Sequence, residues 1–521
     1  MEPMKNLTKF ICLPLLALLS SCVLPSPAET SSHTSTNTSE KSNGGSIEHS
    51  SNVTSAESEY ENGTYHFYCV NDMHGSVLER GSGYYYEAGV AKYFGRLKQL
   101  KEQDPEHTII LSAGDMYQGS LESNFNYGAL ITDAMNAVPF DAMTVGNHEF
   151  DWGVDHLLDN VERADFPVLG GNIMRYDPAG STTPWNRDKF GISTIIQRGK
   201  NKIGIVGMIG EGQTKSITSK NVQDMDFVRP EQLAKDEALR LRNEEGCSMV
   251  ILVIHDSYYN STFAADKTYF DGVFNGHSHS WDSEMISGIP FVQSGCNTRS
   301  ISYFQLVMED GVCSCATYDT ISSNYNWSEN QEIAAIRDSY LNQEQYASKA
   351  TAVAGTVNGY LSTDDGIPCI IEKAIWSKYI GIHPEITLTM CNSQRATLSG
   401  EITYSDIYKA TPFSNKIVIA NVKGSDIHNE VRYNHIYSEN TTSYDDDAYY
   451  TVAVIDYILY HQDTSKRYDY FQSLNEDREN KFIAEYETYP YDLLFDYIHD
   501  DLGGIVNPEE FTSGAPGFDR Y

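Results

Sequence analysis

The segment Gly146-Asn147-His148-Glu149-Phe150-Asp151 places an amide, an imidazole and two carboxylates directly after an apolar, strand-like segment, residues 142–145. A segment that only packs has no use for such a cluster, whereas a site that hydrolyses a phosphate ester with two metal ions does. Such a site needs an amide oxygen on a metal and a neighbouring imidazole that meets the charge developing on a phosphoryl oxygen. Taken alone, the hexapeptide could also be a polar turn that caps a helix, with Asn147 as the N-cap.

Four other predicted strands also end at side chains that can bind metal. The strands cover residues 65–70, 108–112, 249–254 and 270–274, and the side chains that follow them are Asp72 and His74, Asp115, His255, and His277 and His279. The Asp-x-His and His-x-His spacings put both side chains of a pair on one face of an extended segment, so each pair can share a metal. A lone histidine such as His255 is more often a buried core residue than a ligand. The complete, ordered set nevertheless predicts a pair of metal ions, with Asp115 placed to bridge them.

The types of these ligands indicate which metals they suit. Mixed imidazole and carboxylate ligands favour zinc, manganese or cobalt over calcium or magnesium, which prefer shells made only of oxygen. Two such ions about 3.5–4 Å apart would clamp a phosphoryl group, lower the pKa of a bridging water towards about 7 and supply an attacking hydroxide. We therefore expect two divalent cations as cofactors.

Together these segments resemble the motif set of the calcineurin-like metallophosphoesterases, and specifically the bacterial 5′-nucleotidase family. The resemblance implies two ligand sets that share the bridge Asp115, namely Asp72, His74, Asp115 and His279 for one metal, and Asp115, Asn147, His255 and His277 for the other. It also implies a catalytic dyad in which His148 stabilises the transition state and Asp151 orients its ring.

Between these motifs the chain alternates strands and helices, which is typical of a layered α/β architecture. Apolar periodicity and end signals predict helices at 88–103, 129–138 and 232–245, and further strands at 202–208 and 290–294. The family resemblance implies a four-layer αββα sandwich for residues 61–323. A linker helix or hinge is expected over residues 324–350, where Ser328–Glu332 resembles a capping box, followed by a second, smaller α/β domain over residues 351–521.

The second domain resembles the nucleotide-binding domain of the same family, chiefly in Gly400–Tyr408 and Thr411–Asn415. This resemblance implies that the base of a nucleotide stacks on Phe413, with Tyr457 as the facing ring. The family's Asn-x-Gly-Gly-x-Arg loop is represented only by Asn392 and Arg395, and Asp463 is the remaining candidate contact for a ribose hydroxyl. The alternative is that Phe413 and Tyr457 are core or turn aromatics in a chain with 36 tyrosines.

The amino terminus indicates export from the cytoplasm. Lys5 and Lys9 precede an apolar run, residues 10–19, that is too short to span a bilayer comfortably. The run ends in Leu19-Ser20-Ser21-Cys22, which resembles a bacterial lipobox, so residues 1–22 are expected to be a lipoprotein signal peptide with Cys22 lipidated. The alternative is an ordinary export signal that is cleaved nearby. Residues 23–60 are rich in Ser and Thr with few large apolar side chains, and we expect a disordered stalk.

The net charge limits which binding partners are expected, and the cysteine spacing limits which disulfides are expected. The formal charge is −35, from 37 Lys plus Arg against 72 Asp plus Glu, which argues against binding of a nucleic acid polymer. Beyond residue 22 the chain has an odd set of seven cysteines without the spacing of a disulfide framework. We expect most of them to be small buried side chains or free thiols.

The sequence thus predicts a membrane-anchored, extracytoplasmic phosphohydrolase that converts 5′-nucleotides to nucleosides. Hydrolysis of 2′,3′-cyclic nucleotides or nucleotide sugars is an alternative within the same class. A non-catalytic surface lipoprotein is the alternative from another class, and the complete metal and dyad sets argue against it. Having base recognition and metals on separate domains predicts a hinge within the linker. The sequence leaves the oligomeric state and the native metals open.

Overall fold

The computed structural model describes residues 60–392, 394–430, 435–439, 443–463, 465–476 and 482–519. The predicted signal peptide, the lipidation site Cys22 and nearly all of the predicted stalk lie outside these residues. Residues Ser58–Tyr521 are grouped as one compact unit. Within the described ranges, no helix is both long enough and apolar enough to cross a membrane.

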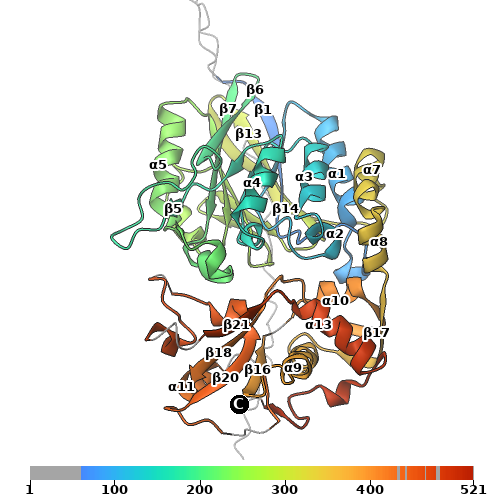
Figure 1. The fold of residues 1–521 in the computed structure, drawn as a ribbon. Helices are drawn as coiled ribbons and strands as arrows, with labels where there is room; N and C mark the ends of the chain where they lie inside the picture. Colours follow the sequence, from blue (N-terminus) through green and yellow to red (C-terminus); the bar gives the residue numbers. More distant parts are fainter. Residues whose placement is uncertain are drawn as a thin grey trace, which may run out of the picture. The chain divides into compact units, whose positions relative to one another are not determined.

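The amino-terminal half is built on two six-stranded sheets (Figure 1). The first has the order β14-β13-β1-β2-β3-β4, formed by Val312–Ser322, Ser300–Glu309, Gly63–Val70, Thr108–Ser112, Ala142–Thr144 and Val168–Leu169. The second has the order β11-β12-β10-β9-β7-β6, formed by Trp281–Ile286, Ile289–Ser294, Gly272–Asn275, Met249–His255, Asn201–Ile209 and Ser193–Arg198. In the first sheet β1 to β4 are parallel, and in the second β7, β9, β10 and β12 are parallel.

The two sheets pack face to face because their central strands are apolar on both sides. Phe304 of β13 stacks on Phe274 of β10, with ring centroids 4.3 Å apart, and lies 5.2 Å from the ring of Phe67 of β1. Gly272 allows this close approach, since a Cβ there would lie 2.5 Å from the Phe304 ring. The three aromatic residues belong to one buried apolar cluster that fills the space between the sheets.

Helices cover the outer face of each sheet. The first sheet packs against α1 (Gly89–Gln103), α3 (Ala129–Asn136), α4 (Val154–Arg163) and α7 (Gln331–Leu341), and the second against α5 (Pro230–Asn243) and α6 (Asn260–Phe263). Figure 1 shows α5 on one side of the paired sheets and α1, α3 and α7 on the other. This is the αββα sandwich that the family resemblance implies, and the expected helices and strands lie within a few residues of their predicted bounds.

The carboxy-terminal half is a second, separate α/β core. A six-stranded mixed sheet has the order β21-β18-β20-β16-β19-β23, formed by Phe482–Tyr486, Ile417–Lys423, Tyr449–Ile455, Ile386–Cys391, His435–Tyr437 and Phe518–Asp519. A three-stranded sheet has the order β17-β15-β22, formed by Leu398–Thr403, Val353–Leu361 and Ile505–Val506. The helices α9 (Gly366–Tyr379), α10 (Tyr404–Ala410) and α13 (Pro490–Asp496) complete its apolar core.

The segment between the two halves differs in detail from its prediction. The helix α7 opens at Asn330, whose side chain accepts hydrogen bonds from the backbone N–H of Glu332 and Ile333 at 3.0 and 3.2 Å. The expected capping box at Ser328 is therefore wrong, because the nearer Asn330 already satisfies these free amides.

The helix α7 packs on the amino-terminal core, whereas α8 (Glu344–Ala350) places Tyr346 and Ala350 in the carboxy-terminal core. The chain therefore passes from one half to the other at Asn342 and Gln343. A hinge in the linker stays a prediction, and these two residues are where it would lie.

Candidate metal centre and substrate cavity

The potential ligands lie at one edge of the paired sheets. Parallel strands all present their carboxyl ends at the same edge, so residues that follow β1, β2 and β3 come close together in space. The same holds for β9 and β10 of the second sheet. Face-to-face packing of the sheets then brings the two sets of strand ends to one place.

The first ligand group consists of Asp72, His74 and His279, whose ligand atoms all lie within 4.8 Å of one another. The Nε2 atoms of His74 and His279 are 2.8 Å apart, and His279 Nε2 lies 3.5 Å from Asp72 Oδ1. Imidazole nitrogens and carboxylate oxygens that lie so close together are stabilised by a cation between them.

The second ligand group consists of Asp115, His255 and His277, again with ligand atoms within 4.8 Å of one another. Asn147 Oδ1 points into this group, 3.2 Å from His255 Nε2 and 3.0 Å from His277 Nδ1. The side chain of Asn147 makes no capping hydrogen bond to the short 3₁₀ helix at His148–Phe150. The alternative interpretation of Asn147 as a mere helix cap is therefore wrong.

Asp115 links the two groups. Its carboxylate lies 3.2 Å from His255 Nε2 and also forms a close cluster with His74 and His148. The Nδ1 atoms of His74 and His255 face backbone carbonyls, Gln118 O at 3.1 Å and Ala113 O at 2.7 Å, so each ring can keep its proton there. Each Nε2 lone pair is then directed into the centre, which is how histidines that bind metal are oriented. The donor set therefore fits two divalent cations.

The charges of the centre also favour cations. Burial acts to lower the pKa of His255, but the Asp115 carboxylate outweighs it and raises this pKa to about 10. For His279, burial again opposes the shift, and a hydrogen bond to Asp72 raises its pKa to about 9. Both shifts show that the carboxylates of the centre favour positive charge, so binding of metal would release protons to solvent.

The backbone at the ligands is not extended, which corrects one step of the sequence analysis. Five of the ligands have a left-handed conformation, with φ of 48° at Asp72, 47° at His74, 56° at Asp115, 75° at His277 and 57° at His279. The period-two argument for each pair was therefore wrong, although both pairs do converge. The chain instead curls over the ends of the strands, and the hydrogen bonds Asp72 N to Gly114 O (2.9 Å) and His74 N to Asp115 O (3.0 Å) hold it there.

Glu149 is a structural residue of the centre to which the sequence analysis gave no role. Its buried carboxylate accepts three backbone N–H groups, from Asp115 at 2.8 Å, Met116 at 2.7 Å and Gly146 at 2.6 Å. Burial and the nearby Asp115 raise the pKa of Glu149 to about 7, although these amides act against that shift. Glu149 thus ties the loop of Asp115 to the loop of Asn147. In the sequence, only the position of Glu149 inside the motif pointed to this role, because the three groups that donate to it are backbone amides.

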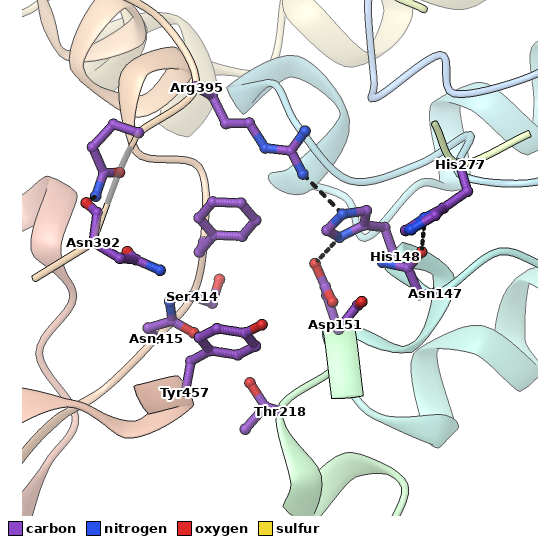
Figure 2. Close-up of a pocket in the computed structure, with 13 residues that line it drawn as sticks. Asn147, His148, Asp151, Thr218, His277, Asn392, Arg395, Ser414, Asn415 and Tyr457 are labelled. Atoms are coloured by element: carbon purple, nitrogen blue, oxygen red, sulfur yellow. Dashed lines mark hydrogen bonds and ion pairs between the residues drawn. The ribbon is translucent and has the colours of Figure 1, made fainter. Parts of the chain in front are cut away.

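His148 lies beside the second ligand group and faces a cavity. Its Nδ1 is 2.7 Å from Asp151 Oδ2, and its Nε2 is 2.8 Å from Arg395 Nη2 (Figure 2). Burial acts to lower the pKa of His148, but the carboxylates of Asp151 and Asp115 outweigh it and raise the pKa above its usual value. The Asp151 contact fixes the orientation of the ring, as the expected dyad requires.

The cavity has a volume of about 390 Å³ and is lined by both halves of the chain. The amino-terminal half contributes Asn147, His148, Asp151, Ser216, Thr218 and His277, and the carboxy-terminal half contributes Asn392, Gln394, Arg395, Phe413, Ser414, Asn415 and Tyr457. Figure 2 shows Tyr457, Ser414 and Asn415 on the side of the cavity away from His148 and His277. Four of the five predicted substrate contacts, namely Asn392, Arg395, Phe413 and Tyr457, therefore line a single cavity that opens onto the predicted dyad.

Asp463 is the exception, because it is not among the residues that line this cavity. Its Oδ1 accepts hydrogen bonds from the N–H and hydroxyl of Ser465, at 2.9 and 2.7 Å, and from the N–H of Arg467 at 3.0 Å. The carboxylate closes a local turn, so the expected contact with a ribose hydroxyl is not supported. Ser216, Thr218, Ser414 and Asn415 also supply polar groups to the wall. Ser414 and Asn415 belong to the segment Thr411–Asn415 that resembles the family, whereas Ser216 and Thr218 did not stand out in the sequence.

The seven cysteines of the described residues are all free, and four of them are buried, as expected. One of the others, Cys296, lies beside the ligand His279.

Comparison with known proteins gives two family matches. Residues 65–281 match the Calcineurin-like phosphoesterase family, and residues 346–432 match the 5′-nucleotidase C-terminal domain. Apyrase of Tabanus yao is 35% identical over 195 residues, which cover 37% of this chain and 34% of that protein. Snake venom 5′-nucleotidase of Crotalus adamanteus is 24% identical over 410 residues, which cover 68% of this chain and 67% of that protein. The match to the apyrase thus spans only about a third of that relative.

The fold is similar to that of solved structures over most of its length. The crystal structure of the 5′-nucleotidase precursor from Thermus thermophilus superposes with a TM-score of 0.70 and 17% identity, covering 85% of this chain and 99% of that one. At this identity the likeness shows that both chains share the two-domain fold.

The structural role of Glu149 can be tested by replacing it with Gln, which keeps the shape of the side chain but turns one acceptor into a donor that faces a backbone N–H. A buried amide left without an acceptor costs about 1–3 kcal/mol, so we expect the free energy of unfolding to fall by about that amount. Metal affinity should fall by about 10-fold or more, because the loops of Asp115 and Asn147 lose their common anchor. Denaturant unfolding and metal titration measure the two effects.

Glu162→Gln is the matched control, because Glu162 is exposed and, within the described ranges, its one ion-pair partner is Lys189. It should change stability by no more than about 0.5 kcal/mol. Equal effects of the two substitutions would show that Glu149 does not organise the centre.

Proposed function

We propose that this protein is an extracytoplasmic hydrolase that releases phosphate from 5′-nucleotides. The chain belongs to the calcineurin-like phosphoesterases and carries a 5′-nucleotidase C-terminal domain, which supports this proposal. The observation that carries the proposal is the composition of the cavity. It places the dyad and two metal ligands, Asn147 and His277, against an arginine and two aromatic rings from the other domain.

The metal centre would serve the phosphoryl end of the substrate. Two divalent cations, when bound, supply charge neutralisation and a strong nucleophile at neutral pH. Family membership supports divalent metals of this kind, and the ligand types favour zinc, manganese or cobalt.

His148 and Arg395 would bind the phosphoryl oxygens that turn towards the cavity. In the structure their side chains meet at 2.8 Å, and an anion is the natural partner for an imidazole and a guanidinium that point at the same place. In the structure Arg395 Nη2 donates to His148 Nε2. With a phosphoryl oxygen in that place, a protonated His148 would donate through Nε2 to the oxygen on which charge develops, while Asp151 holds its Nδ1 proton.

The carboxy-terminal domain would recognise the nucleoside. The guanidinium carbon of Arg395 lies over the Phe413 ring, 5.2 Å from the centroid of that ring. The ring centroids of Phe413 and His148 are 6.0 Å apart. Tyr457 is fixed by a hydrogen bond from its hydroxyl to Lys215 O at 3.3 Å. A base that stacks on these rings would be held at a set distance from His148, and stacking tolerates different bases because every base has a π-face.

The central test is phosphate release from a panel of AMP, a 2′,3′-cyclic nucleotide and UDP-glucose by the protein loaded with manganese or zinc. We expect AMP to be hydrolysed fastest and chelation to abolish turnover. His148→Asn should lower kcat for AMP by about 10²-fold or more, because a donor aimed at the developing charge is lost, while the metal content stays unchanged.

His499→Asn is the matched control, since His499 is an exposed residue on the surface of the second domain. It should leave kcat unchanged. Full turnover in His148→Asn would remove this residue from the mechanism, and faster hydrolysis of the cyclic nucleotide or of UDP-glucose would favour the alternative substrates.

A second test addresses base recognition through Phe413→Ala. Loss of stacking worth about 1–3 kcal/mol should lower kcat/KM for AMP by about 5- to 150-fold, mainly through KM. Hydrolysis of glycerol phosphate, which has no base, should be unaffected. Tyr360→Ala, at an exposed aromatic of β15, is the control. An equal loss on both substrates would mean that Phe413 supports the fold and does not bind the base.

The proposed location has its support in the amino-terminal sequence alone, because residues 1–59 lie outside the described part of the chain. We propose that the protein is anchored in a membrane through a lipid on Cys22. Cys22→Ser should move active enzyme from the detergent-rich to the aqueous phase and abolish labelling by a fatty-acid probe. Labelling that persists in this variant would exclude Cys22 as the anchor.

A further inference from the structure

A third group of potential metal ligands lies in the carboxy-terminal domain and is not part of the cavity described above. It consists of Asp365, immediately before α9, Cys369, one turn into that helix, and His435, the first residue of β19. A thiol, an imidazole and a carboxylate from two separate segments thus face one another. The proposed hydrolytic reaction uses none of them.

The three ligand atoms form an equilateral triangle. Cys369 Sγ lies 3.9 Å from Asp365 Oδ1, Cys369 Sγ lies 3.9 Å from His435 Nδ1, and His435 Nδ1 lies 3.9 Å from Asp365 Oδ1. The centre of such a triangle is about 2.3 Å from each corner, close to the Zn–S distance of about 2.3 Å and slightly beyond the Zn–N distance of about 2.0–2.1 Å. A small inward shift of the imidazole and carboxylate would complete the coordination.

The Cys369 thiol can donate one long hydrogen bond, of 3.9 Å, to either Asp365 Oδ1 or His435 Nδ1. A separation of 3.9 Å between an imidazole nitrogen and a carboxylate oxygen exceeds the reach of a hydrogen bond. The triangle is also largely withdrawn from water, since Cys369 is fully buried and His435 is 4% exposed, while the Asp365 side chain is 28% exposed and leaves a route of entry. Polar atoms held apart in a buried place, with one side open, are what a small cation requires.

Neighbouring groups hold the ligands in place. Asp365 Oδ1 also accepts the N–H of Ser513 at 2.9 Å, which fixes its carboxylate. Glu372, one turn beyond Cys369 on α9, is completely buried, and its Oε2 has no hydrogen-bond partner among the described residues.

We propose that Asp365, Cys369 and His435 bind one zinc-type divalent cation, separate from the catalytic pair. A thiolate and an imidazole select zinc or cobalt over magnesium and calcium, and a water molecule would fill the fourth position. Binding transfers the thiol proton of Cys369 to solvent and leaves the thiolate on the metal, with no change in oxidation state.

From its position, this site would stabilise the loop that follows β16 and contains Asn392. His435 pairs with Cys391 in the ladder between β19 and β16, and Cys391 N donates to Glu372 Oε1 at 3.1 Å. The chain continues from Cys391 into Asn392, which lines the substrate cavity. A cation that joins α9 to β19 would therefore stabilise the strand that carries this loop.

The test uses the full chain loaded with Co²⁺, which serves as a spectroscopic substitute for zinc. We expect about three metal equivalents per chain by elemental analysis, and a near-ultraviolet charge-transfer band from a thiolate bound to cobalt. Cys369→Ser should remove that band and one equivalent of metal. Cys296→Ser is the matched control, because Cys296 lies beside His279 of the catalytic centre, and it should retain both.

Asp365→Asn keeps an acceptor for the Ser513 amide and so guards against a variant that merely fails to fold. It should retain the wild-type circular dichroism spectrum while the affinity for the third equivalent falls by about 10-fold or more. Two equivalents in the wild-type protein, or a thiolate band that persists in Cys369→Ser and disappears in Cys296→Ser, would overturn the proposal.

Discussion

The packing of two sheets against each other is the constraint on which the rest of this structure depends. Each ligand group draws side chains from both sheets, so neither exists within one sheet alone. Asp72 and His74 follow β1, whereas their partner His279 follows β10 in the other sheet. The aromatic stack of Phe67, Phe304 and Phe274 lies between the sheets and fixes their separation. Apolar burial in the core thus sets the distances between ligands at its edge.

The backbone conformation at the edge of the sheets where the ligands lie is unfavourable in free energy. Left-handed backbone at residues other than glycine costs of the order of 1–3 kcal/mol each, and five ligands adopt it. Converging nitrogen and oxygen atoms add repulsion unless a cation or proton lies between them. The surrounding network offsets these costs, above all the three amides that donate to Glu149. These hydrogen bonds hold the candidate ligands in positions where metal ions could bind between them.

In our proposal, chemistry and recognition are divided between the two halves of the chain. The amino-terminal half contributes the candidate metal ligands with His148 and Asp151, and the carboxy-terminal half contributes Arg395 and the rings that line the cavity. They meet where Arg395 contacts His148. In our proposal, the distance between the rings and His148 selects substrates by the separation of base and phosphate. The proposed third metal site lies beside β16, the strand that leads into Asn392 of the cavity.

The sequence by itself determined the strands and the order of the candidate ligands along them, because apolar periodicity and the residue at a strand end are local properties. The αββα architecture, and the choice of Phe413, Tyr457 and Arg395 as substrate contacts, followed from the family resemblance that these motifs carry. Only the tertiary structure decided the left-handed turns at the ligands, the role of Glu149 and the exclusion of Asp463 from the cavity. These depend on backbone amides contributed by other loops or on local turns. No pattern of side chains records where such amides point once distant segments have packed together.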